Sequence, residues 1–164
     1  MDYIKDLGYR ALDSRFKRIS DRMAHDIRKV YREQGLEIEP NWYLILLLLK
    51  ENGQLSIAQI AERLGYAHPT MAILVKKMVA KGFLATQADA QDKRKQQISL
   101  SSKAKNMLPQ LEEIWARCDE AILQILGNDL QILPLLDAME ARLGSQSFYQ
   151  RFQDELSKNS RNNS

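Results

Sequence analysis

The sequence is poor in the residues that form disulfides and metal sites: it has one cysteine, Cys118, and two histidines, His25 and His68. A single cysteine excludes an internal disulfide and is typical of a reducing compartment. With so few nitrogen and sulfur ligands the chain offers no zinc set, and we expect no metal. No Gly-rich phosphate loop follows a strand pattern, and no cluster of histidine, cysteine or acidic residues has catalytic spacing. The sequence therefore favours a protein that is not an enzyme and has no cofactor.

Long apolar runs and a secretion signal are also lacking. The longest apolar stretch, Trp42 to Leu49, is much shorter than the roughly 20 residues that a membrane helix needs. Asp2, Lys5 and Asp6 lie where a signal peptide would have its apolar region. We therefore expect a cytoplasmic protein with no membrane partner.

Acidic residues are absent from one part of the chain. Residues 66–82 carry three lysines and no acidic residue, a net charge of +3. Residues 87–105 carry five basic and two acidic residues, again +3, so the rest of the chain sums to −3 within the total of +3. Such asymmetry is typical of a surface that binds phosphates, although a run of lysines is often only a solvated face.

Two short helical patterns follow one another from residue 56. Ser56 and Gln59 have the spacing of a capping box at the start of the first helix, and Gly65 marks the turn after it. Pro69 suits the first turn of the second helix, because its missing N–H would have no partner there in any case. This order predicts a helix-turn-helix.

A β-hairpin pattern comes next. Strand patterns over residues 83–86 and 96–100 enclose a loop that is long for a hairpin, and loops of that length are usually functional. The tip of the loop holds Asp92, Lys93, Arg94 and Lys95. A narrow minor groove concentrates negative potential and favours an inserted Arg. We predict a mainly α fold with a small β-hairpin wing.

The second helix of the pair carries the candidate base-reading residues. Met71, Leu74, Val75 and Met78 recur at helical spacing and predict its inner stripe. A helix docked in the major groove presents its outer side and its N-terminal end to base edges. The residues outside the wing that we predict to contact DNA are Ser56, His68, Pro69, Thr70, Ala72, Ile73, Lys76 and Lys77.

Three runs of the sequence resemble the MarR family of winged helix-turn-helix transcriptional regulators. They are SIAQIAERLG at 56–65, LVKKMVAKGFL at 74–84 and DKRKQQISLS at 92–101. The last looks like the wing signature of the family, with an Asp, an Arg two residues later and a Leu that closes the returning strand. The resemblance implies a homodimer whose first and last helices interleave, with two winged lobes on successive major grooves of a pseudo-palindromic operator. It also implies that Arg94 enters the minor groove and that Asp92 holds the wing tip in shape.

The second helix departs from the family pattern, which often has a Thr-Arg pair where Ala72 and Ile73 stand. Losing that Arg removes a guanine contact that discriminates by roughly 1–3 kcal/mol. Ile73 or Ala72 could instead contact a thymine methyl group. The remaining contacts would come from Thr70, His68, Lys76 and Lys77.

A seam of apolar residues after the wing supports a dimer. Leu108, Leu111, Trp115, Cys118, Ile122 and Ile125 alternate steps of three and four, which predicts a long helix with a narrow buried stripe. We divide the chain into an N-terminal dimerisation helix (1–35), a DNA-binding lobe (36–101), C-terminal dimerisation helices (102–157) and a frayed tail (158–164). Cys118 is either a structural thiol of this seam or a redox sensor, and its apolar setting favours the structural role.

Four residues could border a cleft for a small aromatic or anionic effector, as in members of the family. They are Phe16, His25, Trp42 and Tyr43. The alternative is that the aromatic residues are ordinary core side chains and that His25 faces solvent.

We therefore expect a homodimeric, sequence-specific regulator of transcription that binds double-stranded DNA, more often a repressor than an activator, and that responds to an effector. The alternative is a winged-helix interaction module that binds protein and does not read DNA. The apolar pair Ala72 and Ile73 is the best argument for that alternative.

Overall fold

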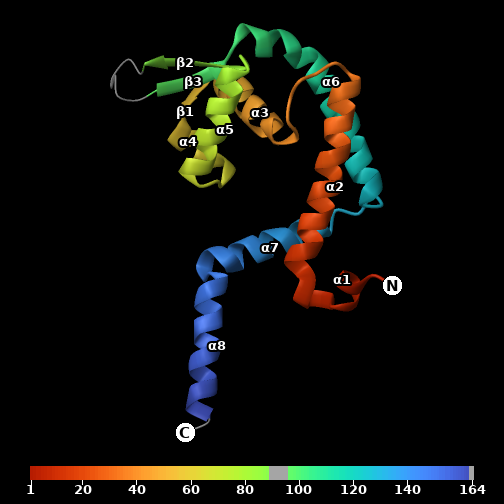
Figure 1. Cartoon of the computed structure of the whole chain (residues 1–164), viewed down its shortest axis with the longest axis vertical. Helices are drawn as coiled ribbons and strands as arrows, with labels where there is room; N and C mark the ends of the chain where they lie inside the picture. Colours follow the sequence, from red (N-terminus) through yellow and green to blue (C-terminus); the bar gives the residue numbers. More distant parts are fainter. Residues whose placement is uncertain (89–95, 163–164) are drawn as a thin grey trace. The chain divides into compact units, whose positions relative to one another are not determined.

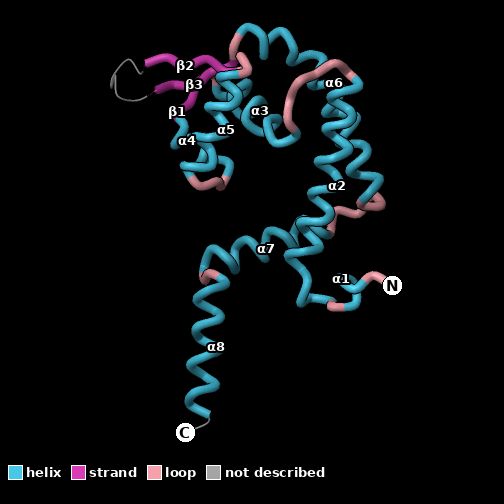
Figure 2. Tube along the Cα trace, in the orientation of Figure 1, coloured by secondary structure: helices cyan, strands magenta, loops and turns pink. Residues whose placement is uncertain are grey.

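The computed structural model describes residues 1–88 and 96–162, and most of these residues are helical (Figures 1 and 2). The predicted fold class, mainly α with a small antiparallel sheet, is confirmed. The chain divides into two compact units, Met1–Pro109 and Gln110–Ser164. The predicted wing-tip contacts, Asp92, Lys93, Arg94 and Lys95, lie outside the described residues.

The first unit begins with a short helix α1 (Tyr3–Asp6), a 3-10 turn η1 (Gly8–Ala11) and the long helix α2 (Leu12–Glu33). The Asp2 carboxylate accepts a hydrogen bond from the Lys5 N–H at the start of α1 and lies 3.0 Å from the Arg18 guanidinium. The side-chain hydrogen bond from Arg18 holds the pKa of Asp2 below its usual range. This pair connects α1 to α2.

The described part of the DNA-binding lobe predicted from the sequence contains seven elements. They are η2 (Pro40–Trp42), α3 (Tyr43–Asn52), β1 (Gln54–Ser56), α4 (Ile57–Leu64), α5 (His68–Ala80), β2 (Leu84–Ala88) and β3 (Gln96–Leu100). Helix α3 is apolar nearly all round, and Ile45, Leu46 and Leu49 are buried. The Trp42 and Phe83 rings meet edge to face with centroids 5.2 Å apart. The core of the lobe thus forms around η2 and α3.

The sheet has three antiparallel strands in the order β1-β3-β2, one more than the predicted hairpin. Strand β3 pairs with both neighbours, placing Leu55 opposite Ile98 and Leu84 opposite Leu100. All four side chains are buried, so the sheet covers the lobe core with one apolar face. Figure 1 shows β2 and β3 extending from the lobe as the two strands of the wing.

Helix α6 (Ser102–Ile125) starts directly after the sheet. The Ser101 hydroxyl caps it by accepting from the Ala104 N–H at 3.1 Å, and it donates to the Gly82 carbonyl at 2.6 Å. Lys103 Nζ donates to the Lys81 carbonyl at 3.0 Å and lies 4.3 Å above the Phe83 ring. These contacts fix the C-terminal end of α5 to the first turn of α6.

Beyond residue 110, the rest of α6 is followed by α7 (Ile132–Ser145) and α8 (Phe148–Asn162). In α6 the predicted seam residues Leu111 and Trp115 are buried, and Cys118 is half-buried. Helix α8 continues to Asn162, so residues 158–162, predicted as a frayed tail, are helical.

The described residues hold neither a membrane span nor a metal cluster. Within 1–88 and 96–162, no helix is both long and apolar enough to cross a bilayer. Over the same residues, no three or more His, Cys, Asp or Glu side chains gather where they could hold a metal ion.

Candidate nucleic-acid interface

Helix α4 sets up the helix-turn-helix through local hydrogen bonds. The predicted capping box is present: Ser56 Oγ accepts from the Gln59 N–H at 3.2 Å, and Gln59 Oε1 accepts from the Ser56 N–H at 2.8 Å. The Ser56 side chain, predicted to contact DNA, is therefore engaged in this cap. Gly65 ends α4 with φ +68°, a left-handed conformation that suits glycine.

Helix α5 packs against the lobe core with one face and exposes the other face to solvent. Met71, Val75 and Met78 are at most 2% exposed and pack into the lobe, as the sequence predicts. The helix begins with Pro69 in its first turn, and its N-cap, Ala67, has no side chain that could satisfy the first N–H groups. The N-terminal end of α5 therefore presents free backbone donors and the positive end of the helix dipole.

The structure brings most of the predicted contacts of α5 onto one exposed face. The exposed residues are His68, Pro69, Thr70, Ile73, Lys76 and Lys77, while Ala72 is half-buried. Residues 66–81 contain no acidic side chain, and Lys76 and Lys77 make the C-terminal half of this face basic. Such a surface, carried by a rigid helix pair, suits the phosphates and base edges of a major groove.

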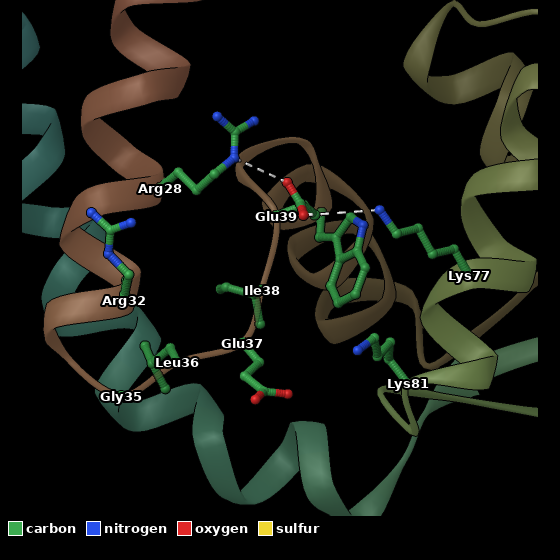
Figure 3. Close-up of a pocket in the computed structure, with 10 residues that line it drawn as sticks. Arg28, Arg32, Gly35, Leu36, Glu37, Ile38, Glu39, Lys77 and Lys81 are labelled. Carbon is green, nitrogen blue, oxygen red and sulfur yellow. Dashed lines mark hydrogen bonds and ion pairs between the residues drawn. The ribbon is translucent and has the colours of Figure 1, made fainter.

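Glu39, in the segment between α2 and η2, contacts cations on both sides (Figure 3). Its Oε2 accepts from Arg28 Nε at 3.3 Å, and its Oε1 lies 3.9 Å from Lys77 Nζ. Figure 3 shows Arg28 on α2 and Lys77 on α5 pointing toward Glu39 from opposite sides. The predicted phosphate anchor Lys77 therefore also faces a carboxylate of its own lobe.

A cavity of about 510 Å³ lies beside this cluster (Figure 3). It is lined by four cationic side chains, two carboxylates, the buried indole of Trp42 and small or apolar residues of the α2–η2 segment. The cations are Arg28, Arg32, Lys77 and Lys81, and the carboxylates are Glu37 and Glu39. Trp42 is 1% exposed, and its Nε1–H has no hydrogen-bond partner among the described residues.

The effector residues proposed from the sequence are only partly found here. Trp42 lines the cavity, whereas Phe16, His25 and Tyr43 do not. His25 and Phe16 lie on exposed positions of α2, and Tyr43 begins α3 with 38% exposure. Sequence reasoning missed Arg28 and Arg32, because the basic pattern of α2 gives no sign of which cations face a cavity.

The helix pair α4 and α5, the three-stranded sheet and the basic face of α5 define a winged helix-turn-helix protein. Residues 36–95 match the sequence model described as MarR family.

One relative is the HTH-type transcriptional regulator SarZ of Staphylococcus epidermidis, 29% identical over 72 residues. That match covers 44% of this chain and 49% of SarZ, so the chain spans about half the length of this curated relative. Among solved structures, MepR of S. aureus in complex with DNA has a TM-score of 0.64 and 19% identity. This match covers 82% of this chain and 96% of the MepR chain. The repressor CouR, bound to a 23-mer DNA duplex, has a TM-score of 0.65 and 22% identity. This match covers 84% of this chain and 96% of CouR. At these identities the structural likeness shows the fold alone.

Proposed function

We propose that this protein is a sequence-specific transcriptional regulator that binds double-stranded DNA in the cytoplasm. The observation that carries the proposal is the exposed face of α5, which is basic, free of acidic residues and held rigidly by the buried stripe beneath it. The winged-helix fold, which DNA-bound MepR and CouR share, supports the same function. The protein acts on promoter DNA and most simply represses by occupying it.

The proposed active form is a homodimer on a pseudo-palindromic operator. Helices α7 and α8 expose large apolar side chains, which is costly in water unless another surface covers them. These side chains are Ile132, Leu133, Leu135, Leu143, Phe148, Tyr149, Phe152 and Leu156. A second copy would bury them and place two α5 helices on successive major grooves, about 34–36 Å apart.

The proposed regulator also responds to a small aromatic or anionic effector in the cavity beside Glu39. Four cations exceed two carboxylates there, and the Trp42 N–H offers a donor with no acceptor among the described residues. A ligand carboxylate would compete with Glu39 for Arg28 and Lys77. Since these two side chains belong to α2 and α5, the exchange would change the connection between the N-terminal helix and the DNA-reading helix.

The experiment that tests this proposal measures binding of the protein to labelled DNA by fluorescence anisotropy. It compares the affinity for the upstream region of the protein's own gene with the affinity for an unrelated fragment, at two salt concentrations. We expect preference for the upstream fragment and steep weakening with salt. Lys76→Ala should weaken binding and lower the salt slope by about 1 for each lobe. The matched control Arg117→Ala removes the same charge from α6 and should leave both unchanged. Equal, weak binding to both fragments would instead favour a protein-interaction module.

A further inference from the structure

Ile73 occupies the centre of the exposed face of α5. Its side chain is 72% exposed, more than any other large apolar side chain that the structure describes between residues 36 and 101. Pro69 and Thr70 precede it by four and three residues, and Lys76 and Lys77 follow it by three and four, so all four are its neighbours on the helix surface. An apolar group thus lies between the N-terminal end of the helix and two lysines.

This arrangement matches one feature of the major groove. Isoleucine has no hydrogen-bonding group, so it cannot read the donors and acceptors of guanine, adenine or cytosine. The only apolar group that a base edge presents in the major groove of unmodified DNA is the C5-methyl of thymine. The lysines that follow Ile73 have the charge and the reach to meet the neighbouring phosphates.

Burial distinguishes Ile73 from its neighbour Ala72. Ala72 is half-buried and has a single methyl group, whereas Ile73 extends a four-carbon side chain from the middle of the outward face. Met71 and Val75, two residues to either side of Ile73, point into the core and are at most 2% exposed. Among the apolar residues from 71 to 75, Ile73 is therefore the one placed to reach a base edge.

We propose that Ile73 determines specificity by contacting the C5-methyl group of a thymine in each operator half-site. The inference rests on the proposed DNA-binding function and adds the chemical group that is read. The competing occupant of this surface is an apolar, acidic segment of a partner protein. The absence of any acidic residue from 66 to 81 would suit both, but the N-terminal end of α5, which has no side-chain cap, favours phosphates.

The test uses the full-length protein and the upstream fragment to which it binds preferentially. Each thymine of the protected region is replaced in turn by deoxyuridine, which lacks only the C5-methyl group. At one thymine per half-site the affinity should fall about fourfold, the value of one buried methyl group. Replacing the same thymine by 5-bromodeoxyuridine should restore affinity, since bromine fills the space of the methyl group.

The variant Ile73→Ala tests whether the sensitivity to the thymine methyl group depends on Ile73. It should bind thymine-containing and deoxyuridine-containing fragments equally, while Ile73→Val keeps part of the difference. An equal fourfold loss in wild type and Ile73→Ala, or no sensitive thymine in wild type, would overturn the inference while leaving DNA binding intact. Failure of the wild type to prefer its upstream fragment would overturn the proposed function itself, and this inference with it. Because Ile73 is exposed and Ala favours helix, Ile73→Ala should retain the wild-type melting temperature.

Discussion

The Glu39 carboxylate lies 3.9 Å from the Lys77 ammonium, so a side chain of the α2–η2 segment contacts α5. The same carboxylate accepts a hydrogen bond from Arg28 on α2. Half-exposed ion pairs contribute only about 0–1 kcal/mol to folding. We therefore expect the effect of Glu39 to be seen in DNA and ligand binding rather than in stability.

The substitution Glu39→Gln keeps the side-chain shape and removes one negative charge beside Lys77. Lys77 then attracts phosphate without competition, so DNA affinity should rise about two- to fourfold at low salt, with a smaller gain at higher salt. Anisotropy titrations at two salt concentrations measure this. Glu37→Gln removes the same charge from the same segment and is the control. Equal gains in both variants would assign the effect to net charge alone.

The cavity beside Glu39 should bind a small aromatic carboxylate, and benzoate is a suitable probe. Trp42 lines the cavity, so titration should change tryptophan fluorescence, and Trp115→Phe should retain the change because it removes the only other tryptophan. Arg32→Ala should weaken benzoate binding about fivefold, the effect of roughly 1 kcal/mol. Lys29→Ala, on the same helix but not lining the cavity, should have no effect. A fluorescence change that vanishes in Trp115→Phe would contradict the assignment.

Ser56→Ala separates a capping role from a DNA contact. The variant loses the bond from the Gln59 N–H, and an N-cap of this kind contributes about 1 kcal/mol. Urea unfolding should therefore show a loss of that size, and Ser56→Thr should recover most of it. DNA affinity of the folded variant should stay within about twofold of wild type. A large loss of affinity at unchanged stability would instead show that the hydroxyl contacts DNA.

Local signals predicted a good part of the lobe. The capping box of Ser56 and Gln59, the turn at Gly65 and the buried stripe of α5 depend on residues three to four apart, so the sequence contains them directly. Strand β1 was missed because three residues, Gln54–Ser56, are too few for an alternation to be read. It is defined by its pairing with β3, more than 40 positions away.

The Glu39 cluster was missed for the same physical reason. Arg28 and Lys77 are about 50 residues apart, Arg28 is one of many basic residues on α2, and Lys77 has a neighbouring lysine, Lys76, on α5. Only the packing of α2, the following segment and α5 decides which cations meet the carboxylate and the cavity. Side-chain exposure likewise distinguishes Ile73 from Ala72, which the sequence left as equal alternatives.

The Cys118 thiol should react slowly with alkylating agents and oxidants. Partial burial, with a smaller contribution from the neighbouring Asp119 carboxylate, raises its pKa above the ordinary value. A raised pKa leaves less thiolate at neutral pH than an exposed cysteine has, and only the thiolate reacts. Iodoacetamide alkylation of the native protein should therefore be slow at pH 7 and rise with a midpoint above that of free cysteine. Cys118→Ser should keep DNA affinity, with or without peroxide. Fast alkylation at pH 7, or peroxide sensitivity that Cys118→Ser abolishes, would instead indicate a redox sensor.

Helix α8 should be part of the dimer contact. Phe148 and Phe152 are 78% and 52% exposed and lie four residues apart, so they form one apolar patch on the helix surface. Replacing both by Ser should shift the protein from dimer to monomer in light scattering, whereas Phe148→Leu with Phe152→Leu keeps the patch apolar and should remain dimeric. Because a monomer meets only one half-site, the Ser variant should also lose at least about tenfold in operator affinity and about half of the salt slope. A Ser variant that stays dimeric would place the dimer contact on other helices, and one that is monomeric yet binds the operator with wild-type affinity would contradict a two-lobed binding mode.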